Sequence, residues 1–135
     1  MSSKTILVVD DEIELLEAIC FPLEIEGYKV LVSHDGEDAL NQARRELPDL
    51  ILLDVMLPKL DGYKVCRLLK SEEKYKHIPI LMLTAKVQEK DKAMGREAGV
   101  DEYIGKPFDI DELLQKVNSY LVKGDYPRPL SKGEK

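Results

Sequence analysis

Apolar runs without polar alternation recur along this chain, and each of them ends in polar residues that carry chemistry. The runs are 6–9 before Asp10 and Asp11, 50–53 before Asp54, 80–83 before Thr84, and 103–104 before Gly105, Lys106 and Pro107. Four consecutive aliphatic residues are typical of a strand covered on both faces, as in a parallel sheet. The pattern therefore predicts buried parallel strands whose carboxyl ends bring these polar groups to one edge of the sheet.

Segments with a helical spacing of apolar residues separate these runs, and a further strand is expected over 29–33. We expect helices over 12–26, after Asp35-Gly36, after Asp61-Gly62, over 88–98, and from Asp109 to about Val122. Five strands that alternate with five helices predict an α/β fold in which a five-stranded parallel sheet is doubly wound as (βα)5.

The spacing of apolar residues also predicts which side chains face the core. These are Ala39, Leu40, Ala43 and Leu47 in the second helix, Val65, Cys66, Leu68 and Leu69 in the third, and Leu113, Leu114, Val117, Tyr120 and Leu121 in the last. The first helix contains Pro22, which removes the hydrogen bond to the Ala18 carbonyl at a cost of about 3 kcal/mol. We therefore expect a kink or an early break in that helix.

Composition narrows the class of protein. With 135 residues, 44% of them hydrophobic and 34% charged, the chain has the size and balance of one globular domain. We expect this domain to occupy residues 1–122, and residues 123–135 to form a flexible tail or linker, because they lack periodicity and contain helix breakers. Cys20 and Cys66 lie in separate helical segments without Cys-x-x-Cys spacing, so we expect no disulfide or metal role for them.

The net charge and the length of the apolar runs argue against nucleic acid and membranes as direct partners. The net charge of −6 argues against direct binding of nucleic acid, which requires a basic face. No apolar stretch approaches the roughly 18 residues that span a bilayer, so we expect no membrane insertion. Residues 1–4 lack the apolar core of a signal peptide, and we therefore expect a cytoplasmic protein.

The polar groups at the strand ends suit a divalent cation and a phosphoryl group. Carboxylates crowded into one pocket repel one another, and a hard cation with oxygen ligands stabilises them. Mg²⁺ fits this set better than zinc, because the strand ends supply no His or Cys. Taken singly, Asp10 and Asp11 fit a helix cap equally well, and Asp54 fits a turn. Their joint placement is what points to a site.

Five short motifs in order resemble the receiver domains of two-component response regulators. They are Val9-Asp10-Asp11-Glu12, Leu53-Asp54-Val55-Met56-Leu57-Pro58, Asp61-Gly62, Leu83-Thr84-Ala85 and Gly105-Lys106-Pro107-Phe108. Each motif is weak alone, but the ordered set is specific and covers about residues 4–122. The resemblance implies a flavodoxin-like fold with strand order 2-1-3-4-5, which makes the first and third strands neighbours.

The resemblance also implies a role for each site residue. Asp54 would be the phosphoacceptor, and the Mg²⁺ ligands would be Asp10, Asp11, Asp54 and the backbone carbonyl of Met56. Lys106 would bind the phosphoryl group, Thr84 would be the switch hydroxyl, and Tyr103 would be the switch aromatic. The Lys106–Pro107 peptide bond would be cis.

By the same resemblance, the protein would be a signalling switch rather than an enzyme that turns over a substrate. It would accept a phosphoryl group from a histidine kinase or phosphotransfer protein and then change the surface of its fourth helix, fifth strand and fifth helix. The downstream partner or output domain is unknown. The protein would be a monomer or a homodimer that forms on phosphorylation.

Three other functions fit parts of the sequence. A haloacid-dehalogenase-like, Mg²⁺-dependent phosphohydrolase needs a second Asp two residues after its nucleophile, whereas Met56 follows Asp54 and Glu12 follows Asp10 at that offset. A nucleotide- or flavin-binding module needs a glycine-rich loop after the first strand, where this chain has Asp-Asp-Glu. A module that binds partners without being phosphorylated would not need the intact acceptor, acidic pair and lysine.

Overall fold

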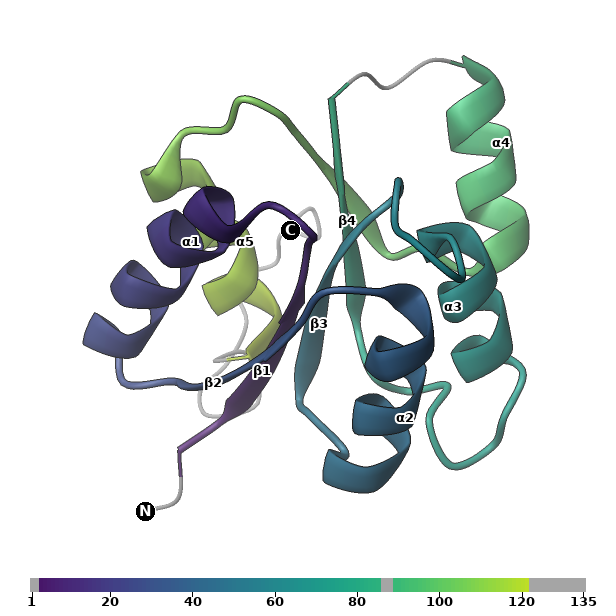
Figure 1. Ribbon diagram of the computed structural model, residues 1–135, viewed down its shortest axis with the longest axis horizontal. Coiled ribbons are helices and arrows are strands. Elements are labelled where there is room, and N and C mark those ends of the chain that lie inside the picture. Colours follow the sequence, from purple (N-terminus) through teal and green to yellow (C-terminus); the bar gives the residue numbers. More distant parts are fainter. Residues whose placement is uncertain (1–2, 86–88, 122–135) are drawn as a thin grey trace, which may run out of the picture.

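The computed structural model describes residues 3–85 and 89–121, which form a central sheet with helices on both faces (Figure 1). In chain order the elements are β1 (Thr5–Val9), α1 (Ile13–Ile25), β2 (Lys29–Ser33), α2 (Gly36–Glu46), β3 (Leu50–Asp54), α3 (Gly62–Lys70), β4 (Ile80–Thr84), α4 (Glu89–Ala98), β5 (Glu102–Gly105) and α5 (Ile110–Leu121). The expected positions Gln88 and Val122, at the ends of the fourth and fifth helices, lie outside the described residues.

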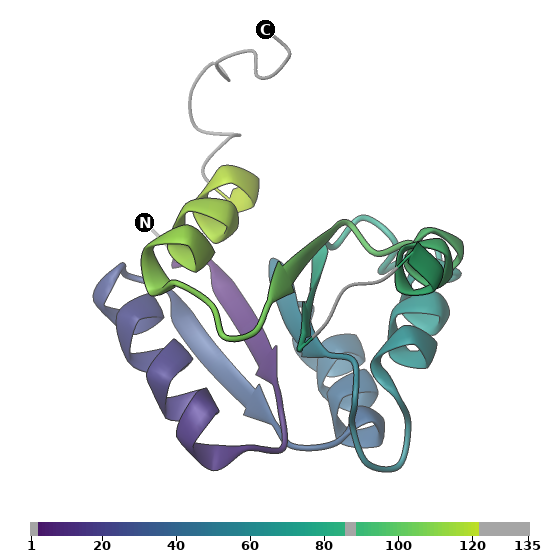
Figure 2. The same cartoon turned by 90° about the horizontal axis from the view of Figure 1, so that it is seen from above.

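The five strands pair in the order β2-β1-β3-β4-β5, and every neighbouring pair is parallel. Helices α1 and α5 cover one face of the sheet, and α2, α3 and α4 cover the other (Figure 1 and Figure 2). The predicted fold class and the predicted strand order are therefore both confirmed. Because β1 and β3 are neighbours, the residues that follow them meet at one edge of the sheet.

Successive residues of a strand pack into two separate hydrophobic cores, one on each face of the sheet. In β3, which is buried along its whole length, Leu52 packs with α1 and α5, whereas Leu53 packs with α2 and α3. The same alternation holds in β5, where Ile104 joins the α1–α5 core and Tyr103 packs against the other. Covering both faces explains why these strands carry apolar runs instead of alternating residues.

Aspartates fix the starts of two helices. The Asp35 carboxylate accepts a hydrogen bond from the Asp38 backbone N–H at 2.7 Å at the start of α2. Asp61 accepts one from the Lys64 N–H at 3.0 Å at the start of α3. Each carboxylate satisfies a backbone donor that has no partner within the helix.

Two residues predicted to face the core are exposed instead. Leu47 is 45% exposed because it caps the end of α2 with a left-handed backbone (φ 50°), which takes it off the helical face. Leu68 is 36% exposed. At about 100° per residue, it lies at the edge of the stripe formed by the buried Val65, Cys66 and Leu69, not within it. The predictions for these two residues were therefore wrong.

Helix α1 continues through Pro22 to Ile25, so the expectation of an early break was wrong. Leu16, Ile19 and Leu23 are at most 4% exposed and anchor the helix to the sheet on both sides of the proline. The backbone N–H of Glu26 donates to the Pro22 carbonyl at 3.1 Å, which closes the last turn. Burial of this apolar face therefore outweighs the loss of one hydrogen bond at Ala18.

The loop between β3 and α3 is held by two close glycine contacts. The Gly36 backbone N–H donates to the Pro58 carbonyl at 3.1 Å, and a Cβ on Gly36 would lie 1.7 Å from the Leu60 carbonyl oxygen. A Cβ on Gly62 would lie 2.3 Å from the Asp54 carbonyl oxygen. Only residues without a side chain permit these approaches, which fix the loop that follows Asp54.

We expect Gly36→Ala to lower the free energy of unfolding by about 1–3 kcal/mol, because the added methyl group collides with backbone that has no room to move. Gly105→Ala is the matched control, since a Cβ there meets nothing within 4 Å. Urea unfolding followed by circular dichroism measures both changes. Equal stabilities for the two variants would contradict the tight loop contact.

Candidate functional site

Three aspartates from two neighbouring strands form the centre of the site. Asp10, Asp11 and Asp54 each place a carboxylate oxygen within 4.8 Å of the others. Asp10 is fully buried and Asp54 is 6% exposed, whereas Asp11 is exposed. The cluster is therefore open to a ligand on the Asp11 side.

Lys106 reaches this cluster from the end of β5. Its Nζ lies 3.0 Å from an Asp10 oxygen and 3.4 Å from an Asp54 oxygen. The other Asp10 oxygen accepts a hydrogen bond from the Glu12 backbone N–H at 3.0 Å. Asp10 therefore supports the turn before α1 and also takes part in the charged cluster. It does not cap the helix, because the N-cap of α1 is Glu12, which makes no side-chain capping hydrogen bond.

The charges in this cluster perturb one another. Burial, and then the charge of Asp10, raise the pKa of Asp54, although Lys106 and the Met56 backbone N–H oppose the rise. Burial alone would lower the pKa of Lys106, but its hydrogen bond to Asp10 and the charges of Asp54 and Asp10 outweigh burial and raise this pKa. One ammonium therefore only partly compensates two buried carboxylates and a third nearby.

Backbone contacts fix the two strand ends that carry Thr84 and Lys106. Thr84 pairs in register with Gly105, and the Thr84 carbonyl accepts a hydrogen bond from the Lys106 N–H at 2.7 Å. The Lys106–Pro107 peptide bond is cis, which confirms the prediction. Thr84 ends β4, the neighbour of β3, which ends at Asp54.

Tyr103 lies on the face of the sheet that α2, α3 and α4 cover. Its ring is half-buried against that core, and its hydroxyl lies 2.9 Å from the hydroxyl of Tyr63. It is thus in contact with α3 rather than with the carboxylates. Sequence reasoning placed Tyr103 on the fifth strand but did not identify Tyr63 as its partner.

Met56 follows the cluster and is 78% exposed. It comes two residues after Asp54, and its backbone belongs to the loop that Gly62 holds against β3. Lys86, two residues after Thr84 in the sequence, lies outside the described residues.

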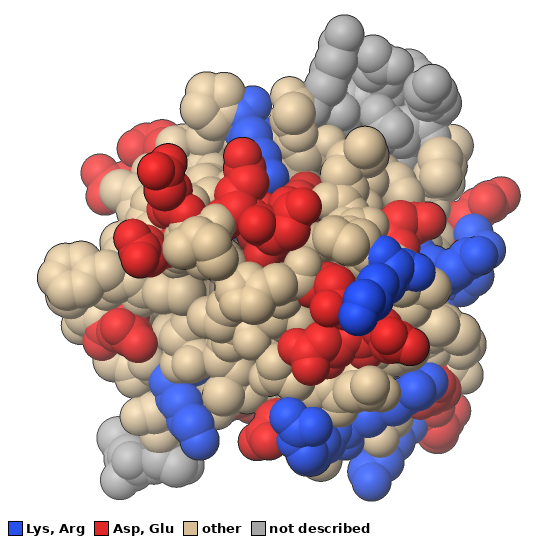
Figure 3. All heavy atoms as spheres, in the orientation of Figure 1, with Lys and Arg blue, Asp and Glu red and all other residues tan. Residues whose placement is uncertain are grey.

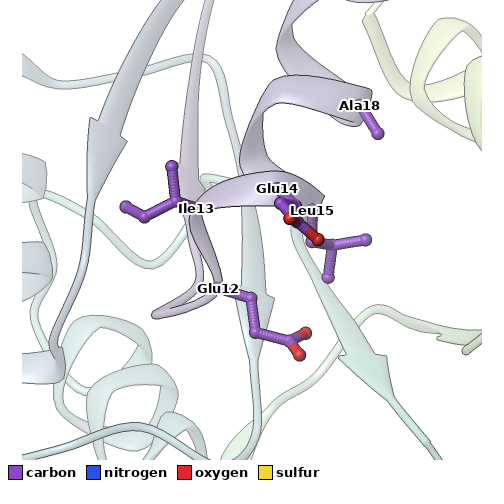
Figure 4. Close-up of a pocket in the computed structure, with 5 residues that line it drawn as sticks. All are labelled: Glu12, Ile13, Glu14, Leu15 and Ala18. Carbon is purple, nitrogen blue, oxygen red and sulfur yellow. The ribbon is translucent and has the colours of Figure 1, made fainter.

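The surface beside the cluster is acidic and hollowed. Acidic side chains gather over the end of β1 and the start of α1 (Figure 3). An open hollow of about 500 Å³ is lined by Glu12, Ile13, Glu14, Leu15 and Ala18, which come from the first turns of α1 and the residue before them (Figure 4). Ile13 is 57% exposed, so this surface combines negative charge with accessible apolar area.

The response regulator receiver domain model matches residues 6–118 of this chain. The match covers most of the sequence, in the same order as the motifs that suggested it. The chain belongs to the family of response regulator receiver domains, as predicted. The haloacid-dehalogenase alternative has no support.

Two curated relatives are transcriptional regulators. The chain is 47% identical over 129 residues to the alkaline phosphatase synthesis transcriptional regulatory protein PhoP of Bacillus subtilis, covering 96% of this chain and 53% of PhoP. It is 42% identical over 120 residues to the DNA-binding dual master transcriptional regulator RpaA of Synechocystis, covering 89% and 50%. The chain therefore spans about half the length of these relatives.

One similar solved structure contains a metal ion. The receiver domain of the sensor histidine kinase PA1611 from Pseudomonas aeruginosa matches with a TM-score of 0.82 and 33% identity, covering 90% of this chain and 99% of that one. Its magnesium ion is coordinated in the active-site cleft. Receiver domains of this family bind Mg²⁺ at an acidic site, and an aspartate cluster is present here.

The described residues also bear on membrane association. Within 3–85 and 89–121, no helix has the length and apolar character needed to cross a bilayer.

We expect Mg²⁺ to raise the melting temperature of the protein, because a bound cation offsets the repulsion in the cluster. At about 100 times its dissociation constant, a ligand of the folded state adds about 2.7 kcal/mol of stability. Asp54→Asn should raise the melting temperature in metal-free buffer at pH 7 and reduce the gain from Mg²⁺. Since the raised pKa of Asp54 favours its protonated form, the ionised carboxylate destabilises the fold above that pKa.

Scanning calorimetry with and without Mg²⁺ measures these shifts. Asp61→Asn is a suitable control, because Asp61 caps α3 outside the cluster. A wild-type melting temperature that Mg²⁺ leaves unchanged would contradict metal binding by these carboxylates.

Proposed function

We propose that Asp54 accepts a phosphoryl group with the help of Mg²⁺, and that the protein signals by changing the surface around α4, β5 and α5. The observation that carries this proposal is the convergence of three carboxylates and Lys106 within one small, partly buried cluster. Membership in the receiver family supports it independently.

The donor set fits a hard divalent cation. Asp10, Asp11 and Asp54, with the Met56 backbone carbonyl, would hold Mg²⁺ through oxygen atoms alone, which is the preference of this ion. When bound, Mg²⁺ supplies positive charge that stabilises both the carboxylates and the incoming phosphoryl oxygens. The raised pKa of Asp54 is the physical sign that the cluster lacks such charge by itself.

Three residues of the chain then take part in the transfer of the phosphoryl group. An Asp54 oxygen attacks the phosphorus in line, and the bond from phosphorus to the donor breaks as the acyl phosphate forms. Lys106 Nζ, already within 3.4 Å of Asp54, donates to the phosphoryl oxygens. The Thr84 hydroxyl turns toward the same oxygens from the end of β4.

The change in the α4–β5–α5 surface follows because the phosphoryl oxygens need hydrogen-bond donors. As Thr84 moves toward the phosphoryl group, it vacates space near β5, and the inward orientation of Tyr103 becomes more favourable. Since Tyr103 contacts α3 and α4, its orientation is transmitted to the outer surface of the α4–β5–α5 region. Phosphorylation thus changes a docking surface without unfolding any element.

The phosphoryl donor is proposed to be a phosphohistidine on a histidine kinase or phosphotransfer protein. The hollow at the start of α1 lies directly after the acidic pair in sequence and offers exposed Ile13 beside Glu12 and Glu14. A partner with an apolar, basic surface around its histidine would match it. We place this exchange in the cytoplasm, and we assign the chain no turnover of other substrates.

The output is proposed to be transcriptional. PhoP and RpaA are transcriptional regulators that are about twice as long as this chain. By this analogy, residues 1–122 act as the receiver unit, and residues 123–135 act as a tail or as a linker to an output domain that binds DNA. The receiver itself, at a net charge of −6, would not contact DNA.

We expect acetyl phosphate to modify the wild-type protein only when Mg²⁺ is present, and Asp54→Asn to abolish the modification. The amide cannot form an acyl phosphate and removes one metal ligand. Intact-mass spectrometry after a fixed incubation measures the phosphorylated fraction.

Asp61→Asn controls for the loss of a carboxylate elsewhere in the same loop, and it should be phosphorylated like the wild type. An unchanged fraction in Asp54→Asn would refute the assignment of the acceptor. Equal phosphorylation in Mg²⁺ and in excess chelator would refute the role of the metal.

We expect Met56→Asn to shorten the lifetime of the acyl phosphate. The Met56 side chain is exposed two residues after Asp54, and its apolar surface orients no water, whereas an amide at this position would hold a water near the phosphorus. Met94→Asn replaces another exposed methionine, on α4, and serves as the control. Time courses of dephosphorylation decide the point, and a Met56→Asn rate equal to or below the wild-type rate would contradict it.

A further inference from the structure

The Tyr103 phenol occupies a tight space between α3 and α4. On one side its hydroxyl meets the Tyr63 hydroxyl at 2.9 Å, and Tyr63 is itself 7% exposed. On the other side, a Cβ added to Gly95 of α4 would lie 2.1 Å from the Tyr103 hydroxyl oxygen. The Tyr103 phenol therefore occupies the space that any side chain at position 95 would fill.

Nothing in the backbone of α4 requires a glycine at position 95. Glycine inside a helix costs about 1 kcal/mol relative to alanine, and Gly95, unlike Gly27 and Gly99, does not have a positive φ angle. The close approach of Tyr103 is the feature that needs it. Similarly, apolar packing of the Tyr63 ring alone would not need its hydroxyl.

We infer that Tyr63 and Gly95 form a socket that holds Tyr103 in its inward orientation, with Tyr63 as a positioning residue that sets the balance of the switch. In this orientation the Tyr103 ring packs toward α3 and α4 rather than toward solvent. The inference rests on the proposed function, in which phosphorylation favours the inward orientation. By linkage, a socket that stabilises this orientation raises the affinity of the site for a phosphoryl group by the factor by which it raises the inward population of Tyr103.

Two variants separate the parts of the socket. Tyr63→Phe removes one hydroxyl and keeps the ring. Gly95→Ala fills the space, and since the clashing atom is the far end of a rotatable side chain, Tyr103 turns outward while α4 keeps its fold. Tyr75→Phe is the matched control, because Tyr75 is half-buried against the same core and its hydroxyl donates to the Arg44 carbonyl at 3.4 Å.

The orientation of Tyr103 is measured first, without any phosphoryl group. Protein labelled with 3-fluorotyrosine gives one fluorine NMR signal per tyrosine, and Tyr103→Phe identifies the signal of Tyr103. We expect this signal to show solvent protection in the wild type and in Tyr75→Phe, partial loss of protection in Tyr63→Phe, and full loss in Gly95→Ala.

The coupling is measured next, as the concentration of beryllofluoride that half-saturates the site in Mg²⁺. We expect a rise of up to about fivefold in Tyr63→Phe, the upper limit for one net hydrogen bond, and a larger rise in Gly95→Ala, in which the inward population is lost. Tyr75→Phe should match the wild type.

Two results would overturn the inference: a Tyr103 signal that stays protected in Gly95→Ala, or a lost signal accompanied by unchanged beryllofluoride affinity. Failure of the proposed function looks different, because the wild type would then not bind beryllofluoride, or Asp54→Asn would bind it equally well. Neither of those two measurements involves a socket variant.

Discussion

Repulsion among Asp10, Asp11 and Asp54 is the constraint on which the rest of the site depends. Two of the three carboxylates are almost fully buried, and one ammonium, from Lys106, touches both of those. Compensation is incomplete, as the raised pKa of Asp54 indicates. A cluster with this deficit of positive charge is poised for a divalent cation, and with that cation for an added anion.

The fold holds this unfavourable cluster by placing its members on separate rigid supports. Asp10 follows β1, Asp54 ends β3, and Lys106 follows β5, while α1 and α5 on one side and α2, α3 and α4 on the other keep the strands in register. Gly36 and Gly62 clamp the loop that follows Asp54. Most of the molecule is therefore scaffold, and its apolar burial offsets the electrostatic cost at one edge.

The sequence predicted this scaffold well because its signals are strong and local. The apolar runs that end in Asp54 and Thr84 marked both the strands and the edge where their polar residues meet. The predictions of buried residues failed where burial depends on the exact direction of a side chain around a helix. Leu68 lies just beyond the buried stripe of α3, and Leu47 caps α2 with a left-handed backbone that takes it off the helical face. Pro22 did not end the first helix early, because tertiary packing outweighs helix propensity there.

The socket around Tyr103 was missed for a different reason. Tyr63 and Tyr103 are 40 positions apart, and no periodicity links a hydroxyl group on α3 with one on β5. Gly95 looks in the sequence like an ordinary weak point of a helix. Its role is seen only in the three-dimensional structure, where the missing side chain at position 95 leaves space for the Tyr103 hydroxyl.

The contact between Lys106 and Asp10 joins residues 96 positions apart, and it has a consequence for the newly made chain. Closing so long a loop carries an entropic cost, which the pairing of the intervening strands reduces. During synthesis, Asp54 leaves the ribosome well before Lys106 does. A nascent or partly folded molecule therefore holds Asp54 without the lysine beside it, and the complete charged cluster exists only once β5 has joined the sheet.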